Sequence, residues 1–135
     1  MNSSARAAVV ARARRCVGVR TRLLGRSAVH GLDCVGLAAF AHGLGPEMFE
    51  AAPYDLRNDN RARLLAGLAR AGFAEVAYGE TGDLVAYDCG RVSAHLAVLA
   101  GNTIIHADFG LRRVVETRAR DDWRPLGSFR RVGED

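Results

Sequence analysis

A cysteine follows an aspartate directly at the start of an apolar helical pattern. Asp33 is a residue type preferred at the N-cap of helices. Leu37, Phe40 and Ala41 then recur at helical spacing. Cys34 therefore belongs in the first turn of a helix, where unpaired backbone N–H groups and the helix dipole favour an anion. A thiol there should lose its proton more easily than a free thiol, whose pKa is about 8.5. The sequence thus predicts that Cys34 is a nucleophile.

Two histidines lie on the arms of a predicted β-hairpin. Gly101-Asn102 is a strong signal for a two-residue turn. The turn sets a register in which Ala97 faces His106 and His95 faces Asp108. Because side chains alternate along a strand, His95 and His106 share one face as diagonal neighbours. Their backbones should lie about 7–8 Å apart, a gap that two imidazole rings can close.

A cysteine and two histidines can form a nucleophile–base–orienter line. One imidazole takes the proton of the thiol, and the other fixes the tautomer and orientation of the first ring. With the N-terminus of the helix packed against the histidine face, Cys34, His95 and His106 reproduce the logic of acyl transfer with a thiolate. Asp108 is a rival orienter because the register puts it opposite His95. We expect the oxyanion to bind the backbone N–H of Cys34, which follows the N-cap residue Asp33.

No metal or cofactor is expected at these residues. A zinc site of Cys34, His95 and His106 is an alternative, but their spacing is not that of a metal motif. The three cysteines include no C-x-x-C pair, which argues against a disulfide scaffold or a structural zinc cage. We interpret Cys16 and Cys89 as small buried hydrophobes.

Length and composition indicate a single globular domain over residues 1–135. Apolar residues make up 49% of the chain and charged residues 25%. No apolar run approaches the roughly 20 residues that span a bilayer, so no membrane partner is expected. The net charge is +4, and all the cationic residues other than histidine are arginines. We interpret them as a solvated surface, because no aromatic interleaving or signature of nucleic-acid binding accompanies them.

The elements that must position these residues can be predicted from periodicity and turn signals. Helices are expected over about 4–16, from Asp33 to near Gly43, and over about 59–71, capped by Asn58 or Asp59 and ended by Gly72. Residues 17–32 should be irregular. Strands are expected over 73–77, 84–87, 93–100, 103–107, 113–116 and 123–132. Helices followed by antiparallel strands define an α+β domain.

Four segments resemble the NlpC/P60 family of papain-like cell-wall peptidases, and they occur in the family's order. Gly31-Leu32-Asp33-Cys34-Val35-Gly36-Leu37 is similar to its D-C-S-G-L segment, with Val35 in place of serine. His95-Leu96-Ala97-Val98 resembles its H-[VA]-[GA]-[IV] strand, and Ile105-His106-Ala107 its I-H-A strand. Gly82-Asp83-Leu84 resembles the preceding G-D-L segment. The resemblance covers about residues 17–110.

The resemblance implies a papain-like α+β fold and hydrolysis of amide bonds in peptidoglycan stem peptides. It makes Cys34 the nucleophile, His95 the general base and His106 the orienting residue. Thr21 stands where many members carry a tyrosine. With Arg22 and Arg26 it is a candidate substrate contact. The alternative is a non-catalytic protein that uses this fold to bind cell wall or tail proteins.

The form G-R-x-x-x-x-G-L-D-C-V-G-L, which includes Arg26, is most similar to members encoded with phage tail or gene-transfer-agent genes. Ser4–Arg15 is rich in alanine, but arginines interrupt the apolar stretch that a secretory signal needs. We therefore expect a protein made in the cytoplasm, carried by a phage-like tail particle and acting on the cell wall. Tail proteins would be its partners.

Overall fold

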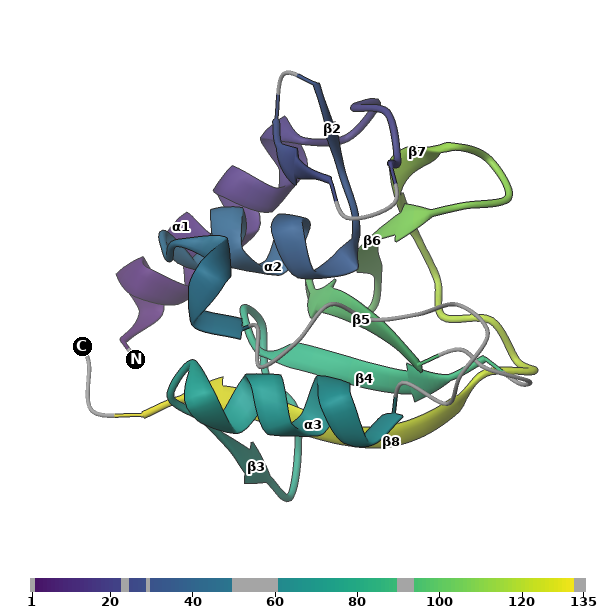
Figure 1. The fold of residues 1–135 in the computed structure, drawn as a ribbon. Coiled ribbons are helices and arrows are strands. Elements are labelled where there is room, and N and C mark those ends of the chain that lie inside the picture. Colours follow the sequence, from purple (N-terminus) through teal and green to yellow (C-terminus); the bar gives the residue numbers. More distant parts are fainter. Residues whose placement is uncertain (1, 23–24, 29, 50–60, 90–93, 133–135) are drawn as a thin grey trace.

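The computed structural model describes residues 2–22, 25–28, 30–49, 61–89 and 94–132 (Figure 1). Its helices are α1 (Ser3–Arg15), α2 (Cys34–His42), a short 3-10 helix η1 (Pro46–Phe49) and α3 (Arg61–Arg70). Its strands are β1 (Arg26–Ser27), β2 (Gly31–Leu32), β3 (Phe73–Val76), β4 (Leu84–Asp88), β5 (Ala94–Leu99), β6 (Ile104–Asp108), β7 (Arg113–Thr117) and β8 (Arg124–Arg131). The predicted α+β class is confirmed.

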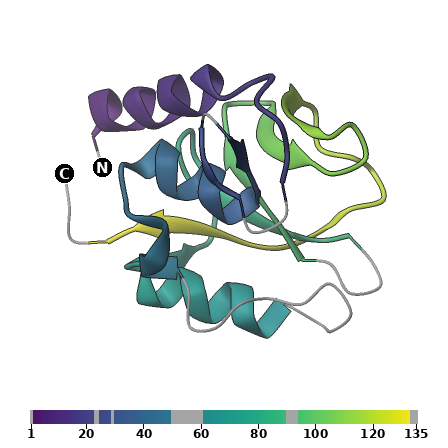
Figure 2. The same ribbon diagram turned by 45° about the horizontal axis from the view of Figure 1, so that its top comes forward.

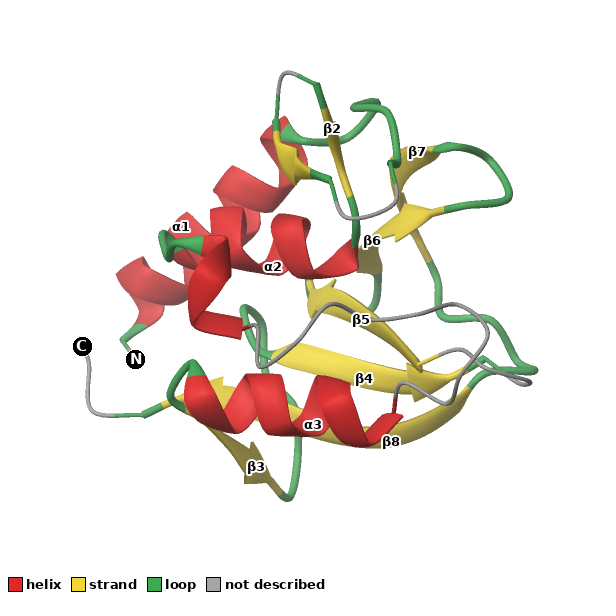
Figure 3. Cartoon of the chain, viewed as in Figure 1, coloured by secondary structure: helices red, strands yellow, loops and turns green. Residues whose placement is uncertain are grey.

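Six strands form one antiparallel sheet in the order β3-β8-β4-β5-β6-β7 (Figure 3). The last strand, β8, lies between β3 and β4, so the C-terminal part of the chain joins β3, the strand that follows α3, to the rest of the sheet. β1 and β2 form a separate two-stranded ribbon. Because β2 ends one residue before α2, this ribbon leads the chain into the cysteine helix.

Helix α2 begins and ends where the sequence predicts. The Asp33 carboxylate accepts a hydrogen bond from the Gly36 N–H at 2.7 Å, and Gly43 closes the helix in a left-handed conformation at φ 67°. A Cβ on Gly36 would clash with the carbonyl oxygen of Gly25, so the backbones of α2 and the ribbon touch at a glycine. The predicted caps of α3, Asn58 and Asp59, lie outside the described residues.

The two faces of the sheet bury different side chains. Apolar residues of α1, α2 and α3 pack on one face, against alternate residues of the central strands that include Leu96, Val98, Ile105 and Ala107. Figure 2 shows α1 and α2 stacked along this side. A smaller cluster on the other face contains Val85, Tyr87, Ala97 and Ile104, with Trp123 packed against it. The hairpin strands β5 and β6 therefore alternate between a helix-covered face and a second apolar face.

The β5–β6 hairpin has the predicted register only near its turn. Ala100 donates to the Thr103 carbonyl at 2.9 Å, and the ladder continues through Val98–Ile105. It ends there, although β5 remains paired with β4 and β6 with β7. The expected facing of His95 and Asp108 is therefore wrong, because the two strands separate before they reach these residues.

Residues 17–32, expected to be irregular, contain ordered pairing that supports the start of α2. Thr21 forms a parallel bridge with Leu32, and Arg20 forms an antiparallel bridge with Arg113 of β7. This segment thus connects the edge of the large sheet to the residue just before Asp33. None of the described helices is both long and apolar enough to cross a membrane.

Candidate active site

The helix that carries Cys34 starts on a buried acidic residue. Asp33 is fully buried, and its carboxylate forms an ion pair with Arg26 of β1 while it caps α2. The Asp33 N–H in turn donates to the Gly25 carbonyl at 2.9 Å. These contacts fix the direction in which the first turn of α2 leaves the ribbon, and with it the position of Cys34.

The sulfur of Cys34 lies against β5 at the residue next to His95. Two backbone N–H groups act on the thiol, those of Leu96 and Val35. Ala100 donates toward β6, and the N–H groups of alternate residues of an antiparallel strand point the same way, so the Leu96 N–H also points toward β6. Since the ladder ends at Val98, this donor is left for the sulfur. The separation of the two strands thus creates the place where Cys34 meets β5.

The two imidazoles are joined as the hairpin predicts. His95 Nε2 lies 3.2 Å from His106 Nδ1, and the ring planes are perpendicular. His106 is buried, and its other nitrogen, Nε2, lies 3.1 Å from the hydroxyl of Thr117 on β7. Because His95 Nε2 is occupied by His106, only Nδ1 of His95 remains to exchange a proton with another group.

The body of helix α2 packs against the face of the sheet opposite the histidines. Its apolar residues cover the face that carries Leu96 and Ile105, while the histidines share the opposite side with Trp123. Alternation of side chains on a strand places neighbours such as His95 and Leu96 on opposite faces. The first turn of α2 brings Cys34 to β5 at the strand separation, and that its sulfur faces the rings stays a prediction.

The pKa of Cys34 is raised to about 12, which corrects the expectation of an acidic thiol. Burial is the larger cause, because it disfavours the charged form, and the neighbouring Asp33 carboxylate adds to it. The N–H groups of Leu96 and Val35 and the guanidinium of Arg26 act in the opposite direction but do not outweigh the burial. The N-cap carboxylate that starts the helix thus opposes ionisation of the thiol that follows it.

Both imidazoles are also kept neutral. Burial, followed by the charge of His106, lowers the pKa of His95 to about 4. Burial lowers the pKa of His106 as well, while the carboxylate of Asp108 acts to raise both values. At neutral pH the Cys34 thiol and both imidazole rings are therefore uncharged.

The other predicted site residues occupy three different positions. Asp108 is half-buried and accepts a hydrogen bond from the Leu111 N–H at 3.0 Å, so it orders the β6–β7 turn and acts on the histidines through its charge. Arg26 pairs with Asp33. Thr21 is buried, and its hydroxyl has no hydrogen-bond partner among the described residues. Arg22 is exposed beside it.

Sequence reasoning missed two residues that touch the histidines. Thr117 is the last residue of β7. A threonine at the end of a predicted strand does not by itself indicate a contact with His106. Trp123 precedes β8, and its ring centroid lies 5.2 Å from both imidazole centroids. The guanidinium of Arg120 lies 5.7 Å from the centroid of the same indole. Trp123 is the chain's one tryptophan, which is the only hint the sequence offered.

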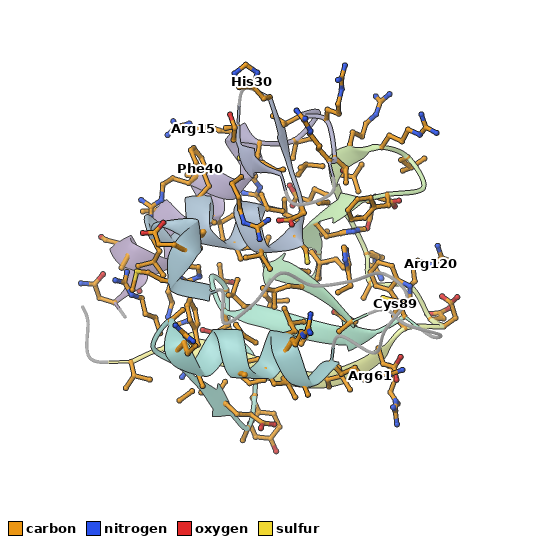
Figure 4. All side chains as sticks on the ribbon, in the orientation of Figure 1. Arg15, His30, Phe40, Arg61, Cys89 and Arg120 are labelled. Atoms are coloured by element: carbon orange, nitrogen blue, oxygen red, sulfur yellow. The ribbon has the colours of Figure 1, made fainter. Side chains whose placement is uncertain are left out.

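The remaining cysteines and histidines lie elsewhere. Cys16 is buried in the main core, and His30 lies at the far end of the ribbon, away from Cys89 and Arg120 (Figure 4). Cys89 is half-buried beside Tyr87 and Trp123. Among the described residues, no group of three or more His, Cys, Asp or Glu side chains is arranged to hold a metal ion.

Comparison with solved structures places this fold among NlpC/P60 domains. The NlpC/P60 domain of the peptidoglycan hydrolase SagA superposes with a TM-score of 0.63 at 20% identity, over 93% of this chain and 97% of that one. The P60 domain of an antigen from M. avium subspecies paratuberculosis gives 0.65 at 19% identity, over 98% and 97%. The peptidoglycan hydrolase RipB from Mycobacterium tuberculosis gives 0.59 at 21% identity, over 97% and 66%. Neither a family model nor a curated protein sequence matches this chain. These likenesses establish the papain-like α+β fold that the sequence predicts.

Proposed function

We propose that this chain is a cysteine endopeptidase that hydrolyses amide bonds in the stem peptides of peptidoglycan. The observation that carries the proposal is the bond between His95 Nε2 and His106 Nδ1, on the strand that the Cys34 sulfur contacts. Acyl transfer requires a nucleophile, a base and an orienting group, and we assign these roles to Cys34, His95 and His106. Two of the three similar structures named above, SagA and RipB, are described as peptidoglycan hydrolases, which supports this substrate class.

The attack begins from an uncharged site. As the Cys34 sulfur bonds to the carbonyl carbon, the thiol proton passes to His95 Nδ1, and the carbonyl electrons move to oxygen. Burial disfavours a resting thiolate–imidazolium pair, so proton transfer accompanies the attack. The Cys34 N–H at the start of α2 stabilises the oxyanion. His106 accepts from His95 Nε2–H and holds the imidazolium in place.

The intermediate collapses with loss of the amine. The C–N bond breaks as His95 gives its proton to the leaving nitrogen, and the acyl group stays on Cys34 as a thioester. Water then gives a proton to His95 while its hydroxide adds to the acyl carbon. The C–S bond breaks, the carboxylic acid leaves, and His95 returns its proton to the sulfur, which restores the thiol. Every proton in this cycle passes through His95 Nδ1.

Substrate contacts and delivery form a second part of the proposal. We propose that Arg22, exposed on the segment that pairs with Leu32, meets a carboxylate of the stem peptide, with Thr21 beside it. Arg26 acts through Asp33. We further propose that a phage-like tail particle carries the protein to the cell wall, which rests on the likeness of the segment from Gly25 to Leu37 to tail-encoded members.

Digestion of purified peptidoglycan with mass spectrometry of the fragments tests the activity and names the bond. Wild type and the Cys89→Ala control should release the same new muropeptides, whereas Cys34→Ala should release none. Cys89 is the matched control because it is also half-buried and lies outside the proposed triad. Fragmentation by Cys34→Ala at the wild-type rate would overturn the proposal.

The raised pKa of Cys34 favours one other candidate function, a domain that binds cell wall without cutting it. A soluble stem peptide with an activated ester in place of the scissile amide separates the two, because its fast leaving group lets acylation outrun hydrolysis, and an enzyme then accumulates a thioester on Cys34 that intact-mass spectrometry detects. Binding of that peptide without any mass increase or turnover would identify the binding domain.

A further inference from the structure

The histidine pair continues into a longer chain of hydrogen bonds. His106 Nε2 lies 3.1 Å from the Thr117 hydroxyl, on the side of the ring away from His95. Thr117 is the last residue of β7, the strand that pairs with β6 along its whole length. The neighbouring strand therefore fixes the hydroxyl relative to His106.

Only one arrangement of protons lets His95 act as a base. Its Nδ1 must carry the lone pair, so its Nε2 carries the hydrogen and donates to His106 Nδ1. His106 must then carry its own hydrogen on Nε2, which makes Thr117 Oγ1 the acceptor. If His106 held its hydrogen on Nδ1, two N–H groups would point at each other across 3.2 Å.

The indole of Trp123 covers this chain. Its centroid lies 5.2 Å from each imidazole, and Tyr87 packs against it at 5.5 Å. An edge-to-face ring removes water that would otherwise compete for the nitrogen atoms, and hydrogen bonds strengthen as the local dielectric falls. Arg120 lies over the outer side of the indole.

We propose that Thr117 and Trp123 are positioning residues for the histidine pair: the Thr117 hydroxyl accepts from His106 Nε2–H and stabilises the tautomer that His95 requires, and Trp123 keeps water from the bond between the rings. The inference rests on the proposed function, since it assigns His95 Nδ1 as the base. Neither residue touches the reacting atoms, so each acts through the imidazoles.

Thr117→Val should lower kcat, because it removes the acceptor while keeping the shape of the side chain. We expect a loss of roughly 10-fold, the lower range for residues that orient a functional histidine, with KM unchanged. Thr117→Ser should retain the wild-type rate. The control is Thr81→Val, an exposed threonine in the turn before β4. Equal kcat in Thr117→Val and wild type would overturn the role of Thr117.

Nitrogen NMR of labelled histidine reads the tautomer without any substrate. Wild type and Thr117→Ser should hold the His106 hydrogen on Nε2, and Thr117→Val should show a share of the Nδ1 form. An unchanged tautomer in Thr117→Val would contradict the inference. This measurement also stands if the chain cleaves nothing, so failure here is distinct from failure of the proposed function.

Trp123→Ala should move the acid limb of kcat/KM to higher pH, because water then reaches the rings and relaxes the burial that lowers the pKa of His95. The titratable or charged groups around the pair are Asp108, Arg120, Cys34 and Tyr87. Trp123→Phe should give a smaller shift, and Tyr78→Ala, at an exposed aromatic, none. A Trp123→Ala variant with lower kcat but an unmoved limb would overturn the role of Trp123.

Discussion

The chemistry of Cys34 is set by residues that touch it and by its burial more than by its place in a helix. A helix N-terminus favours an anion, but only by partial charges, whereas Asp33 supplies a full negative charge one residue away. Arg26 pairs with that carboxylate and acts on the thiol in the opposite direction. Asp33 and Arg26 are therefore opposing controls on the same sulfur.

Asp33→Asn should speed alkylation of Cys34 by iodoacetamide, and Arg26→Gln should slow it. Asparagine keeps the capping oxygen but removes the charge that raises the pKa of Cys34. A thiol pKa lower by one unit gains tenfold in thiolate and loses roughly threefold in nucleophilicity, a net gain of about threefold. Mass spectrometry of the labelled protein at pH 7.5 measures both rates. If both variants changed the alkylation rate in the same direction, Asp33 and Arg26 would not act on the Cys34 thiol in opposite directions.

The pH profile should show a base that is available well below neutrality. His95 accepts a proton only when neutral, and its pKa is lowered to about 4, so kcat/KM should rise through about pH 4 and stay level across neutral pH. The Cys34 thiol, with its pKa raised to about 12, adds no limb in that range. Initial rates on a soluble stem peptide measure the profile. A limb near the ordinary histidine pKa of about 6.5 would show that His95 is hydrated in the working enzyme.

At the scale of elements, α2 is anchored at both ends by polar contacts. Asp33 holds the start, and at the other end His42 Nε2–H donates to the Gly82 carbonyl at 2.9 Å while its ring packs on Phe73 at 4.9 Å. His42 is buried, and burial lowers its pKa to about 4. The C-terminal anchor of the cysteine helix is therefore sensitive to acid.

Stability should fall between pH 7.5 and 5, and His42→Gln should reduce that fall. The unfolded chain takes up a proton near the ordinary pKa of about 6.5, whereas the folded chain resists it until about 4, so stability is full above 6.5 and declines as the pH drops toward 4. The difference amounts to about 2 kcal/mol at pH 5 for this residue. Urea unfolding at the two pH values measures it. An equal fall in wild type and variant would show that other groups cause it.

A cross-strand pair of like charges weakens the contact between residues 17–22 and β7. Arg20 and Arg113 face each other in an antiparallel bridge, and like charges in that position are destabilising. Arg113→Thr should therefore stabilise the fold by about 0.5 kcal/mol at low salt, with a smaller gain in 1 M NaCl. Urea unfolding measures the gain, and Arg118→Thr is the control at an exposed arginine of the next loop. A loss of stability in Arg113→Thr would contradict the repulsion between the two arginines.

Across the whole molecule, the sequence predicts well those features that depend on residues close together in the chain. The cap at Asp33, the turn at Gly101-Asn102 and the alternation along β5 and β6 depend on local propensity and period, and the structure confirms them. The pKa of Cys34 and the contacts of Trp123 depend on segments about 60 or more and about 20 residues away in the chain. Local pattern carries no information on such burial, which explains why those expectations were wrong or missing.

Ion pairs between α1 and the sheet also join segments that are far apart in the chain, and among the described residues they lie near both ends of the helix. Near its start, Arg6 reaches Asp83 at 3.3 Å, and Arg130 of β8 binds the same carboxylate at 2.8 Å. Near its end, Arg14 binds Glu116 of β7 at 3.0 Å in an exposed position. Asp83 is fully buried, so one carboxylate holds together the first helix, the turn before β4 and the last strand, whose ends lie on the same side in Figures 1 and 2.

Asp83→Asn should cost far more stability than Glu116→Gln. Loss of the buried carboxylate removes the counter-charge of Arg6 and leaves Arg130 only its pair with the exposed Glu80 at 3.1 Å. Breaking a buried pair typically costs about 3–5 kcal/mol, whereas an exposed pair contributes at most about 1 kcal/mol. Urea unfolding measures both, and a double-mutant cycle with Arg130→Met isolates the coupling. Because Asp83 lies outside the contacts of Cys34, His95 and His106, the folded fraction of Asp83→Asn should keep wild-type kcat at low temperature. Equal costs for the two variants would contradict the structural role assigned to Asp83 and would show that solvent or Glu80 replaces its carboxylate.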